Sequence, residues 1–285
     1  MTHPFMIGLL VRQAAHSLRT ESDFDTARLD VEMLLAHVLK RPRSYVFSHS
    51  DAVLSDVQYE AFERALLRRL NGEPIAYIVG ECEFWSLMLS VTPAVLIPRP
   101  DTEVLVEWVL EQCPETELRV MDAGTGSGAI AIALASERPA WTVCAMDQSM
   151  AALRVAQTNL CTHQLDARIQ LHQGWWCNAV SDQSLDVLVS NPPYIDACDA
   201  HLNQGDVRFE PRSALVADAH GLADIHIIAA QARRVLKPNA ILVLEHGWQQ
   251  SADVRSVLQT NGFKSCASVN DLAGHERMTV GFNPT

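Results

Sequence analysis

The stretch from Leu118 to Gly128 reads LRVMDAGTGSG, in which a short apolar run ends at Asp122 and three glycines precede a run of small apolar residues. This order predicts a strand, a tight loop and a helix. Glycines in such a loop tolerate positive φ angles and let a ligand approach the backbone, and the helix amino end offers unpaired N–H groups. The spacing is Gly-x-Gly-x-Gly, not the Gly-x-Gly-x-x-Gly of dinucleotide sites, which disfavours a pyrophosphate ligand.

Strand and helix patterns continue to alternate along the chain, which is typical of a parallel sheet covered by helices on both faces. We predict strands at 118–122, 142–146, 167–171, 185–190 and 240–245, and helices at 129–138, 150–163, 223–235 and about 252–260. Two final strands, 264–269 and 278–282, have no helix between them. The predicted fold is therefore an α/β, Rossmann-like sheet, mostly parallel, with an antiparallel edge.

The residues before this sheet predict a small helical bundle. Apolar residues form one stripe over 26–39, and Ser55 to Gln58 has the spacing of a capping box that opens a helix through Leu70. From Tyr77 to Val91 the pattern is β-like and predicts a hairpin, with Tyr77-Ile78-Val79 in its first part. We expect three parts: a helical bundle that positions a substrate (1–74), a hairpin linker (75–95) and the α/β domain (96–285).

Composition restricts the location and the partners. The chain has 285 residues, 48% of them hydrophobic, and a net charge of −12, which gives no general attraction to nucleic acid phosphates. No apolar run has membrane length, and the apolar patch at 5–11 lacks the basic residue that precedes a secretory signal. Seven scattered cysteines without a Cys-x-x-Cys pair indicate reduced thiols. We expect a cytoplasmic protein with no metal site, no membrane contact and no stably bound nucleic acid.

A second motif follows the strand at 185–190, where residues 185–196 read LDVLVSNPPYID. Two consecutive prolines have fixed φ and no N–H, so they hold the Asn191 side chain rigidly at the strand's carboxyl end, where open α/β sheets bind ligands. The Asn191 side-chain oxygen and the Pro192 carbonyl can accept both hydrogens of a planar NH₂ group, and the Tyr194 ring can cover one face of that group. The turn therefore indicates a substrate with an amide or an aromatic amine.

Asp147 ends the strand at 142–146. A carboxylate in that position can accept both hydroxyls of a ribose, as the acidic residue of dinucleotide folds does. The alternative is a cap on the helix that begins near Met150.

Several motifs together resemble the HemK/PrmC family of peptide chain release factor glutamine methyltransferases, which are class I S-adenosylmethionine-dependent enzymes with an N-terminal helical domain. The matching segments cover most of the chain from about residue 75. They are Leu96-Ile97-Pro98-Arg99-Pro100-Asp101-Thr102-Glu103, Asp122 to Gly128, Ser190 to Ile195, Arg208-Phe209-Glu210-Pro211 with Ala214-Leu215, and Glu245-His246-Gly247.

The resemblance implies a substrate, a cofactor and a site. The substrate is the glutamine of the Gly-Gly-Gln loop of class I release factors, methylated on its side-chain nitrogen, and S-adenosylmethionine becomes S-adenosylhomocysteine. The residues expected at the cofactor are Gly124, Thr125, Gly126, Ser127, Gly128, Asp147, Trp175 and Asn191. Those expected at the glutamine amide are Asn191, Pro192, Pro193 and Tyr194, of which Asn191, Pro192 and Tyr194 are the expected catalytic residues. A monomer is expected.

Some alternatives stay open at this stage. The family commonly has an acidic residue where this chain has Gly174, so Trp175 is either an adenine neighbour or a packing residue. Arg99 either meets the substrate, bridges domains or forms a structural salt bridge, and Glu210 either lines the substrate loop or pairs with Arg208 or Arg212. Two other functions compete with the first. One is a DNA or RNA base amino-group methyltransferase that uses the same turn, and the other is a nicotinamide-dependent oxidoreductase or degenerate cofactor-binding module.

Overall fold

The computed structural model describes residues 5–22 and 26–284 and divides into two compact units. One unit comprises the chain up to Glu81 together with Asn203–Phe209, and we call it the helical unit. The other comprises Cys82–Leu202 and the residues from Glu210 onward, and we call it the catalytic unit.

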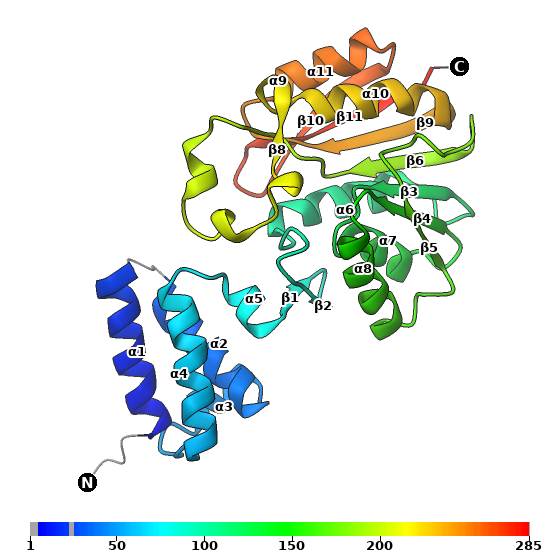
Figure 1. Cartoon of the computed structure of the whole chain (residues 1–285). Coiled ribbons are helices and arrows are strands. Elements are labelled where there is room, and N and C mark those ends of the chain that lie inside the picture. Colours follow the sequence, from blue (N-terminus) through cyan, green and yellow to red (C-terminus); the bar gives the residue numbers. More distant parts are fainter. Residues whose placement is uncertain (1–4, 23–25, 285) are drawn as a thin grey trace. The chain divides into compact units, whose positions relative to one another are not determined.

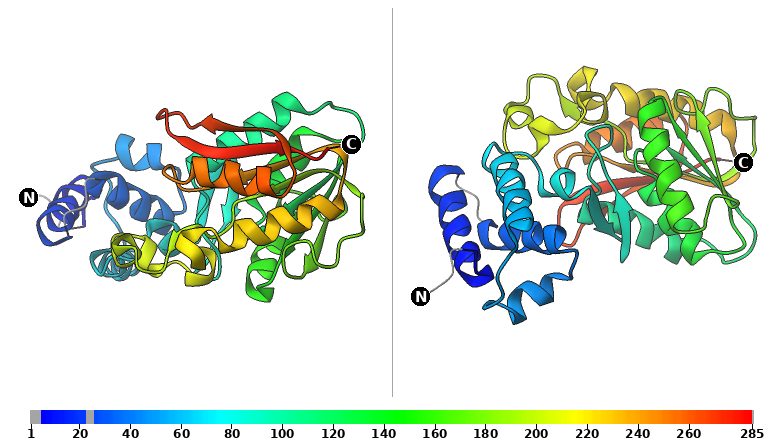
Figure 2. Two further views of the ribbon diagram at one scale, coloured as in Figure 1. Left: turned by 90° about the horizontal axis from the view of Figure 1, so that it is seen from above. Right: turned by 60° about the horizontal axis from the view of Figure 1, so that its bottom comes forward.

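The helical unit is a bundle of short helices around one apolar core, drawn in blue to cyan in Figures 1 and 2. Leu18, Leu34, Leu35 and Phe62 lie in that core. The capping box predicted at Ser55 is present, because its hydroxyl accepts the Gln58 amide N–H and the Gln58 side chain accepts the Ser55 amide N–H. The helices are α1 (Ile7–Ser22), α2 (Ala27–Leu39), α3 (Arg43–Ser48), α4 (Asp56–Leu70) and α5 (Ile75–Val79).

The strand predicted at Tyr77-Ile78-Val79 is wrong, since these residues form the helix α5. Pro74 precedes the helix with extended φ and ψ, and Gly80 ends it in the left-handed region at φ 86°. A short apolar run between a proline and a glycine is compatible with either structure. Here Ile75, Tyr77 and Ile78 are buried, and Ile75 and Ile78 belong to the apolar core of the bundle. The hairpin itself begins later, with β1 (Glu81–Phe84) and β2 (Leu87–Ser90).

A seven-stranded sheet forms the centre of the catalytic unit, in the order β10-β11-β9-β6-β3-β4-β5. β9, β6, β3, β4 and β5 pair in parallel, and β11 is antiparallel to both of its neighbours, β9 and β10. The predicted fold class is confirmed, with the antiparallel pair at one edge. The strands are β3 (Arg119–Ala123), β4 (Thr142–Asp147), β5 (Ile169–Gln173), β6 (Leu185–Ser190), β9 (Leu236–Glu245), β10 (Lys264–Asn270) and β11 (Glu276–Phe282).

Helices cover both faces of this sheet (Figure 1). Alternate strand residues point to opposite faces, so that Val120 joins one apolar cluster with α6 and α7, while Met121 joins another with α10 and α11. The helices are α6 (Pro100–Gln112), α7 (Ala129–Glu137), α8 (Met150–Thr162), α9 (Asp218–Gly221), α10 (Ala223–Val235) and α11 (Ser251–Thr260). Short strands β7 (Ile195–Asp196) and β8 (Val216–Ala217) pair beside the sheet, and single 3-10 turns occur at Ala200–Asn203, Val207–Phe209 and Arg212–Ala214.

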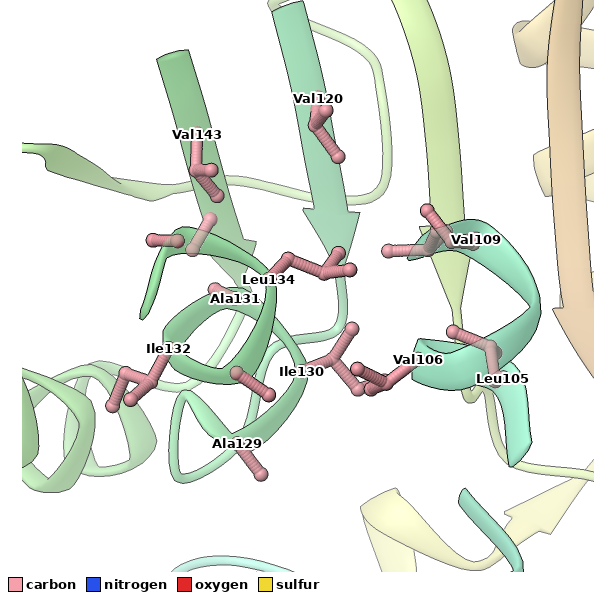
Figure 3. Close-up of a cluster of buried hydrophobic side chains, with 14 of the residues drawn as sticks. Leu105, Val106, Val109, Val120, Ala129, Ile130, Ala131, Ile132, Leu134 and Val143 are labelled. Carbon is pink, nitrogen blue, oxygen red and sulfur yellow. The ribbon is translucent and has the colours of Figure 1, made fainter. Parts of the chain in front are cut away.

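α7 is the most deeply buried of these helices. Its sequence, AIAIALASE, has apolar residues on every side, and residues 129–135 are all buried. Figure 3 shows Leu134 directed toward the strands and Ile130 directed toward Val106 of α6. Burial on all sides holds the amino end of α7, and with it the glycine loop, in a fixed place at the end of β3.

The β1–β2 hairpin is fixed to the catalytic unit by a buried amide. The Ser90 amide N–H donates to Asn159 Oδ1 at 2.7 Å, and Asn159 Nδ2 donates to the Ser90 and Ser127 carbonyls at 3.0 and 2.9 Å. Asn159 thus joins the hairpin, α8 and the glycine loop.

Within the described residues, no helix has both the length and the hydropathy that a membrane-spanning helix needs.

Candidate functional site

A cavity opens at the carboxyl ends of β3, β4 and β6, within the catalytic unit. Eight of the residues expected at the site line it: Gly124, Thr125, Gly126, Ser127, Asp147, Trp175, Asn191 and Pro193. Gly128, Pro192 and Tyr194 lie next to these in the chain but are not part of the cavity wall. Residues more than sixty positions apart in sequence therefore meet at the carboxyl ends of the parallel strands, as parallel topology requires.

The glycine loop adopts the conformation for which glycine is suited. Gly124, Gly126 and Gly128 have φ angles of 80°, 56° and 85°. A Cβ atom on Gly124 would lie 3.0 Å from the Trp176 ring, whereas one on Gly126 would meet no protein atom within 4 Å. Gly126 thus presents bare backbone to the cavity, and Gly124 is required by packing.

The amide groups of this loop are largely used within the protein. The N–H groups of Gly124 and Thr125 donate to the Met146 carbonyl at 2.8 and 2.9 Å, and that of Gly126 donates to Asp147 Oδ2 at 2.9 Å. These three N–H groups, which precede the amino end of α7, are therefore paired within the protein. The loop offers close backbone approach and small size instead.

Asp147 lies between two backbone amides. Besides the Gly126 amide, the Ser149 amide donates to its Oδ1 at 2.8 Å. Burial raises the pKa of Asp147, and the two amide hydrogen bonds oppose that shift. Each carboxylate oxygen keeps a further lone pair, so a diol of the ribose type has two acceptors within reach of the cavity.

Asp122 is a residue of this region whose role the sequence did not indicate. Its side chain is fully buried, and Oδ2 accepts the Thr125 hydroxyl at 2.6 Å and the Ala131 amide at 3.2 Å. Oδ1 has no hydrogen-bond partner among the described residues. Burial raises the pKa of Asp122 to about 7. The Asp122 carboxyl group therefore joins the glycine loop, at Thr125, to α7, at Ala131.

The Asn191 turn is attached to the glycine loop by its preceding residue. The Ser190 hydroxyl, at the end of β6, donates to the Ala123 carbonyl, at the end of β3, at 2.5 Å. The two prolines are buried. On the far side of the turn, the Tyr194 carbonyl accepts Gln250 Nε2 at 3.0 Å. The turn is thus held at both ends.

The side chains of Asn191 and Tyr194 each make a further contact with a buried residue. Asn191 Nδ2 donates to Thr102 Oγ1 at 3.2 Å, and the Tyr194 hydroxyl donates to Glu245 Oε1 at 3.3 Å. Thr102 lines the cavity and is buried, and Glu245 is buried at the end of β9. Burial raises the pKa of Glu245 to about 7.

The two tryptophans have different surroundings. Both line the cavity, but 47% of the Trp175 surface is exposed, whereas Trp176 is buried against the glycine loop and donates from Nε1 to Asp224 Oδ1 at 3.1 Å. Trp176 is therefore the more deeply packed of the two. A Cβ atom on Gly174 would lie 2.8 Å from Met146 Sδ, so a larger residue there would displace Met146.

Arg99 and Glu210 pair with each other. Arg99 Nη2 donates to Glu210 Oε2 at 2.7 Å, and the Ile97 amide donates to Glu210 Oε1 at 3.2 Å. The sequence left open whether Glu210 lines the substrate loop or pairs with Arg208 or Arg212. The structure pairs it with Arg99, 111 positions away, which is the structural salt bridge considered for Arg99. Arg99 also lines the cavity, so the pair stiffens the cavity wall.

Metal chemistry has no visible centre in the part of the chain that the structure describes, where no three His, Cys, Asp or Glu side chains converge. The cavity is lined by oriented acceptors such as Asp147 and Asn191.

Comparison with known proteins agrees with this geometry. Residues 10–80 match the model of the PrmC N-terminal domain, and residues 100–209 match that of the methyltransferase small domain. The "Release factor glutamine methyltransferase" of Salmonella typhimurium is 48% identical over 96% of this chain and 98% of its own length. The protein of that name from Escherichia coli is 45% identical over 95% and 96%.

The fold also has a counterpart among solved structures. A methyltransferase from Pyrococcus furiosus matches 78% of this chain and all of its own, with a TM-score of 0.54 and 16% identity. At that identity the match concerns the fold alone. The resemblance drawn from the motifs is confirmed by the relatives that match at 45–48% identity.

Proposed function

Because this chain belongs to the release factor glutamine methyltransferase family, we propose that it methylates the side-chain amide nitrogen of the glutamine in the Gly-Gly-Gln loop of class I release factors. The protein is a methyltransferase that uses S-adenosylmethionine. The single observation that supports the proposed substrate best is the Asn191 turn, in which Asn191 lines the cavity beside the glycine loop.

The residues around the cavity fit the cofactor. Gly126 leaves room for a ligand against the backbone, and the Asp147 carboxylate suits the two hydroxyls of a ribose. We assign Gly124 to Gly128, Asp147, Trp175 and Asn191 to cofactor binding, with Gly128 acting through the packing of α7 on Ala156. When bound, S-adenosylmethionine supplies a methyl group made electrophilic by its sulfonium sulfur.

The substrate amide needs alignment more than it needs a base. Its nitrogen is a weak nucleophile, because the lone pair is delocalised into the carbonyl. In the proposal, Asn191 Oδ1 and the Pro192 carbonyl accept the two N–H groups, and these bonds strengthen as positive charge grows on the nitrogen. Once methylated, the nitrogen releases one of its two protons to solvent and becomes the neutral N-methyl amide. The rigid prolines fix the direction of both acceptors, and Pro193 and Tyr194 border the amide plane. Such alignment supplies up to roughly 7–11 kcal/mol in favourable systems.

We extend the proposal to the roles of the domains, the location and the oligomeric state. The helical bundle at 1–74 would position the release factor, the segment 75–95 would link it to the domain at 96–285, and the protein would act as a cytoplasmic monomer. Methylation of a nucleic acid base is not favoured, since the net charge is −12 and the relatives are named for a protein substrate.

Transfer of label from S-adenosylmethionine tests the proposal. Purified protein is incubated with a class I release factor, with the same factor carrying alanine in place of its loop glutamine, or with bulk nucleic acid. We expect label in the first factor only. Label in the nucleic acid, or equal label in the two factors, would overturn the proposed substrate.

A further inference from the structure

Thr102 and Glu245 lie beneath the Asn191 turn and take no part in the proposed cofactor or substrate contacts. They come from distant parts of the chain, Thr102 from the first turn of α6 and Glu245 from the last residue of β9. Only 4% of Thr102 and 3% of Glu245 is exposed. Two polar side chains at that depth need a reason, because each loses its hydration on folding.

Two hydrogen bonds join them to the turn. Asn191 Nδ2 donates to Thr102 Oγ1 at 3.2 Å, and the Tyr194 hydroxyl donates to Glu245 Oε1 at 3.3 Å. The Thr102 hydroxyl also lies beside the Glu245 carboxyl group and favours its charged form. Asn191 and Tyr194 thus each contact one member of this buried pair.

The direction of these bonds decides which end of the Asn191 amide faces the cavity. A carboxylate only accepts, so a charged Glu245 favours a Thr102 hydroxyl whose single proton is directed toward it and whose oxygen lone pair is left for Asn191 Nδ2. Only the NH₂ end of the Asn191 side chain can use that lone pair. Its Oδ1 is then directed away from Thr102, where it can accept the substrate amide.

We propose that Thr102 and Glu245 are positioning residues, which together hold the Asn191 side chain with its oxygen toward the substrate. This inference rests on the proposed function and adds to it the element that sets the polarity of the acceptor. Protonated Glu245 would carry a donor of its own, which could reverse the Thr102 hydroxyl and release the Asn191 amide to rotate.

The charged and titratable neighbours of Glu245 place its ionisation near neutral pH. Burial raises its pKa to about 7, while Thr102, Tyr194 and Arg277 lower it and Asp101 raises it. Burial and Glu245 also raise the pKa of Tyr194, so its hydroxyl stays a donor. His246, the next residue, is bonded instead to Thr279 Oγ1 at 2.7 Å and to the Gly247 carbonyl at 2.9 Å.

Kinetics of release factor methylation provide the first test. For Thr102→Val we expect kcat to fall about 10²-fold, as for a misplaced catalytic group, while the affinity for S-adenosylmethionine changes by less than about threefold. Thr102→Ser keeps the hydroxyl and should restore most of kcat. For the wild type kcat should rise with pH through about 7, and Glu245→Gln should be slow and lack that rise. Thr279→Val, a buried threonine bonded to His246, is the matched control and should keep wild-type kcat.

A second readout needs no substrate. In protein labelled with ¹⁵N at asparagine, the side-chain NH₂ signal of Asn191, identified by its absence in Asn191→Ala, should shift with pH near 7 in the wild type and not in Glu245→Gln. A wild-type kcat in Thr102→Val, an equal loss in Thr279→Val, or an Asn191 signal that ignores pH would each overturn the inference. If the wild type fails to methylate the factor, the proposed function fails, and the Asn191 signal still decides the positioning roles.

Discussion

Arg69 in the helical unit and two carboxyl groups in the catalytic unit show two different ways of burying charge. In the helical unit, Arg69 donates from Nε to Asp30 and from Nη1 to Asp206, both at 2.8 Å, so the buried guanidinium and the buried Asp30 neutralise each other. In the catalytic unit, the buried carboxyls of Asp122 and Glu245 each keep one oxygen without a hydrogen-bond partner among the described residues.

This difference separates two reasons for placing a polar group inside a protein. The Arg69 cluster is complete, and it holds α2, α4 and the segment 203–209 together within one unit. The carboxyl groups of Asp122 and Glu245 each have one oxygen without a hydrogen-bond partner among the described residues. Burial raises the pKa of both groups to about 7. Asp122 is bonded to the glycine loop and Glu245 to the Asn191 turn, the two loops that border the cavity. We infer that the first arrangement serves stability and that the second is retained for the site at some loss of stability.

The largest effect on stability is expected where the complete cluster is broken. Arg69→Met leaves Asp30 buried without its partner and should lower the free energy of unfolding of the helical unit by about 3–5 kcal/mol. Hydrogen exchange in α2 and α4 and urea denaturation measure the loss. Adding Asp30→Leu should recover most of it, because no unpaired buried charge remains. Equal stability of Arg69→Met and the wild type would contradict the role given to the cluster.

At the Asn191 turn we expect a large loss of activity with little loss of stability. Asn191→Ala should leave the melting temperature nearly unchanged and lower kcat by about 10²–10³-fold, as the loss of one oriented partner of the developing charge does in other enzymes. Asn261→Ala removes an asparagine whose Nδ2 donates to the Val257 carbonyl in α11 and is the control for stability. Near-normal turnover in Asn191→Ala would refute its assigned role.

The buried carboxyl groups of Asp122 and Glu245 should make the free energy of unfolding depend on pH. Asp122 has a pKa of 3.8 when unfolded and about 7 when folded, so between these values the unfolded chain binds fewer protons and stability falls as pH rises. Asp122→Asn resembles the protonated form and should remove part of this fall, on the order of 1–3 kcal/mol between pH 4 and 7. Denaturation at several pH values measures it, and parallel curves for the variant and the wild type would contradict it.

The smallest effect concerns the glycine loop. Gly126→Ala and Gly205→Ala place a Cβ atom at similar φ angles, 56° and 52°, and neither Cβ meets protein atoms within 4 Å. Both should lower stability by about 1 kcal/mol. Only Gly126→Ala should weaken S-adenosylmethionine binding, by about tenfold or ~1.4 kcal/mol in calorimetry, because only its Cβ enters the cavity. Equal cofactor affinity in both variants would remove Gly126 from the cofactor site.

Much of the fold could be predicted because its signals are local. The alternation of strands and helices, the glycine loop after β3 and the capping box at Ser55 depend on neighbouring residues and were confirmed. The error at Tyr77–Val79 has the same origin, since a three-residue apolar run carries no period. Pro74 before it and Gly80 after it were the available signals for a short helix.

Several contacts of the site could not be predicted from local patterns. Glu210 pairs with Arg99, 111 positions away. Asn191 meets Thr102, 89 positions away. A local pattern gives no information on which strand lies beside which, and these partners are set by the order of the sheet.

The sequence by itself determined which chemical groups stand at the ends of the strands, because turn residues such as the two prolines and the three glycines constrain their own backbone. Only the tertiary structure decided that the Asn191 amide rests on Thr102, that Trp176 and not Trp175 packs under the glycine loop, and that Asp122 and Glu245 are buried there. The physical reason is that burial and hydrogen bonding between distant segments are properties of the assembled sheet.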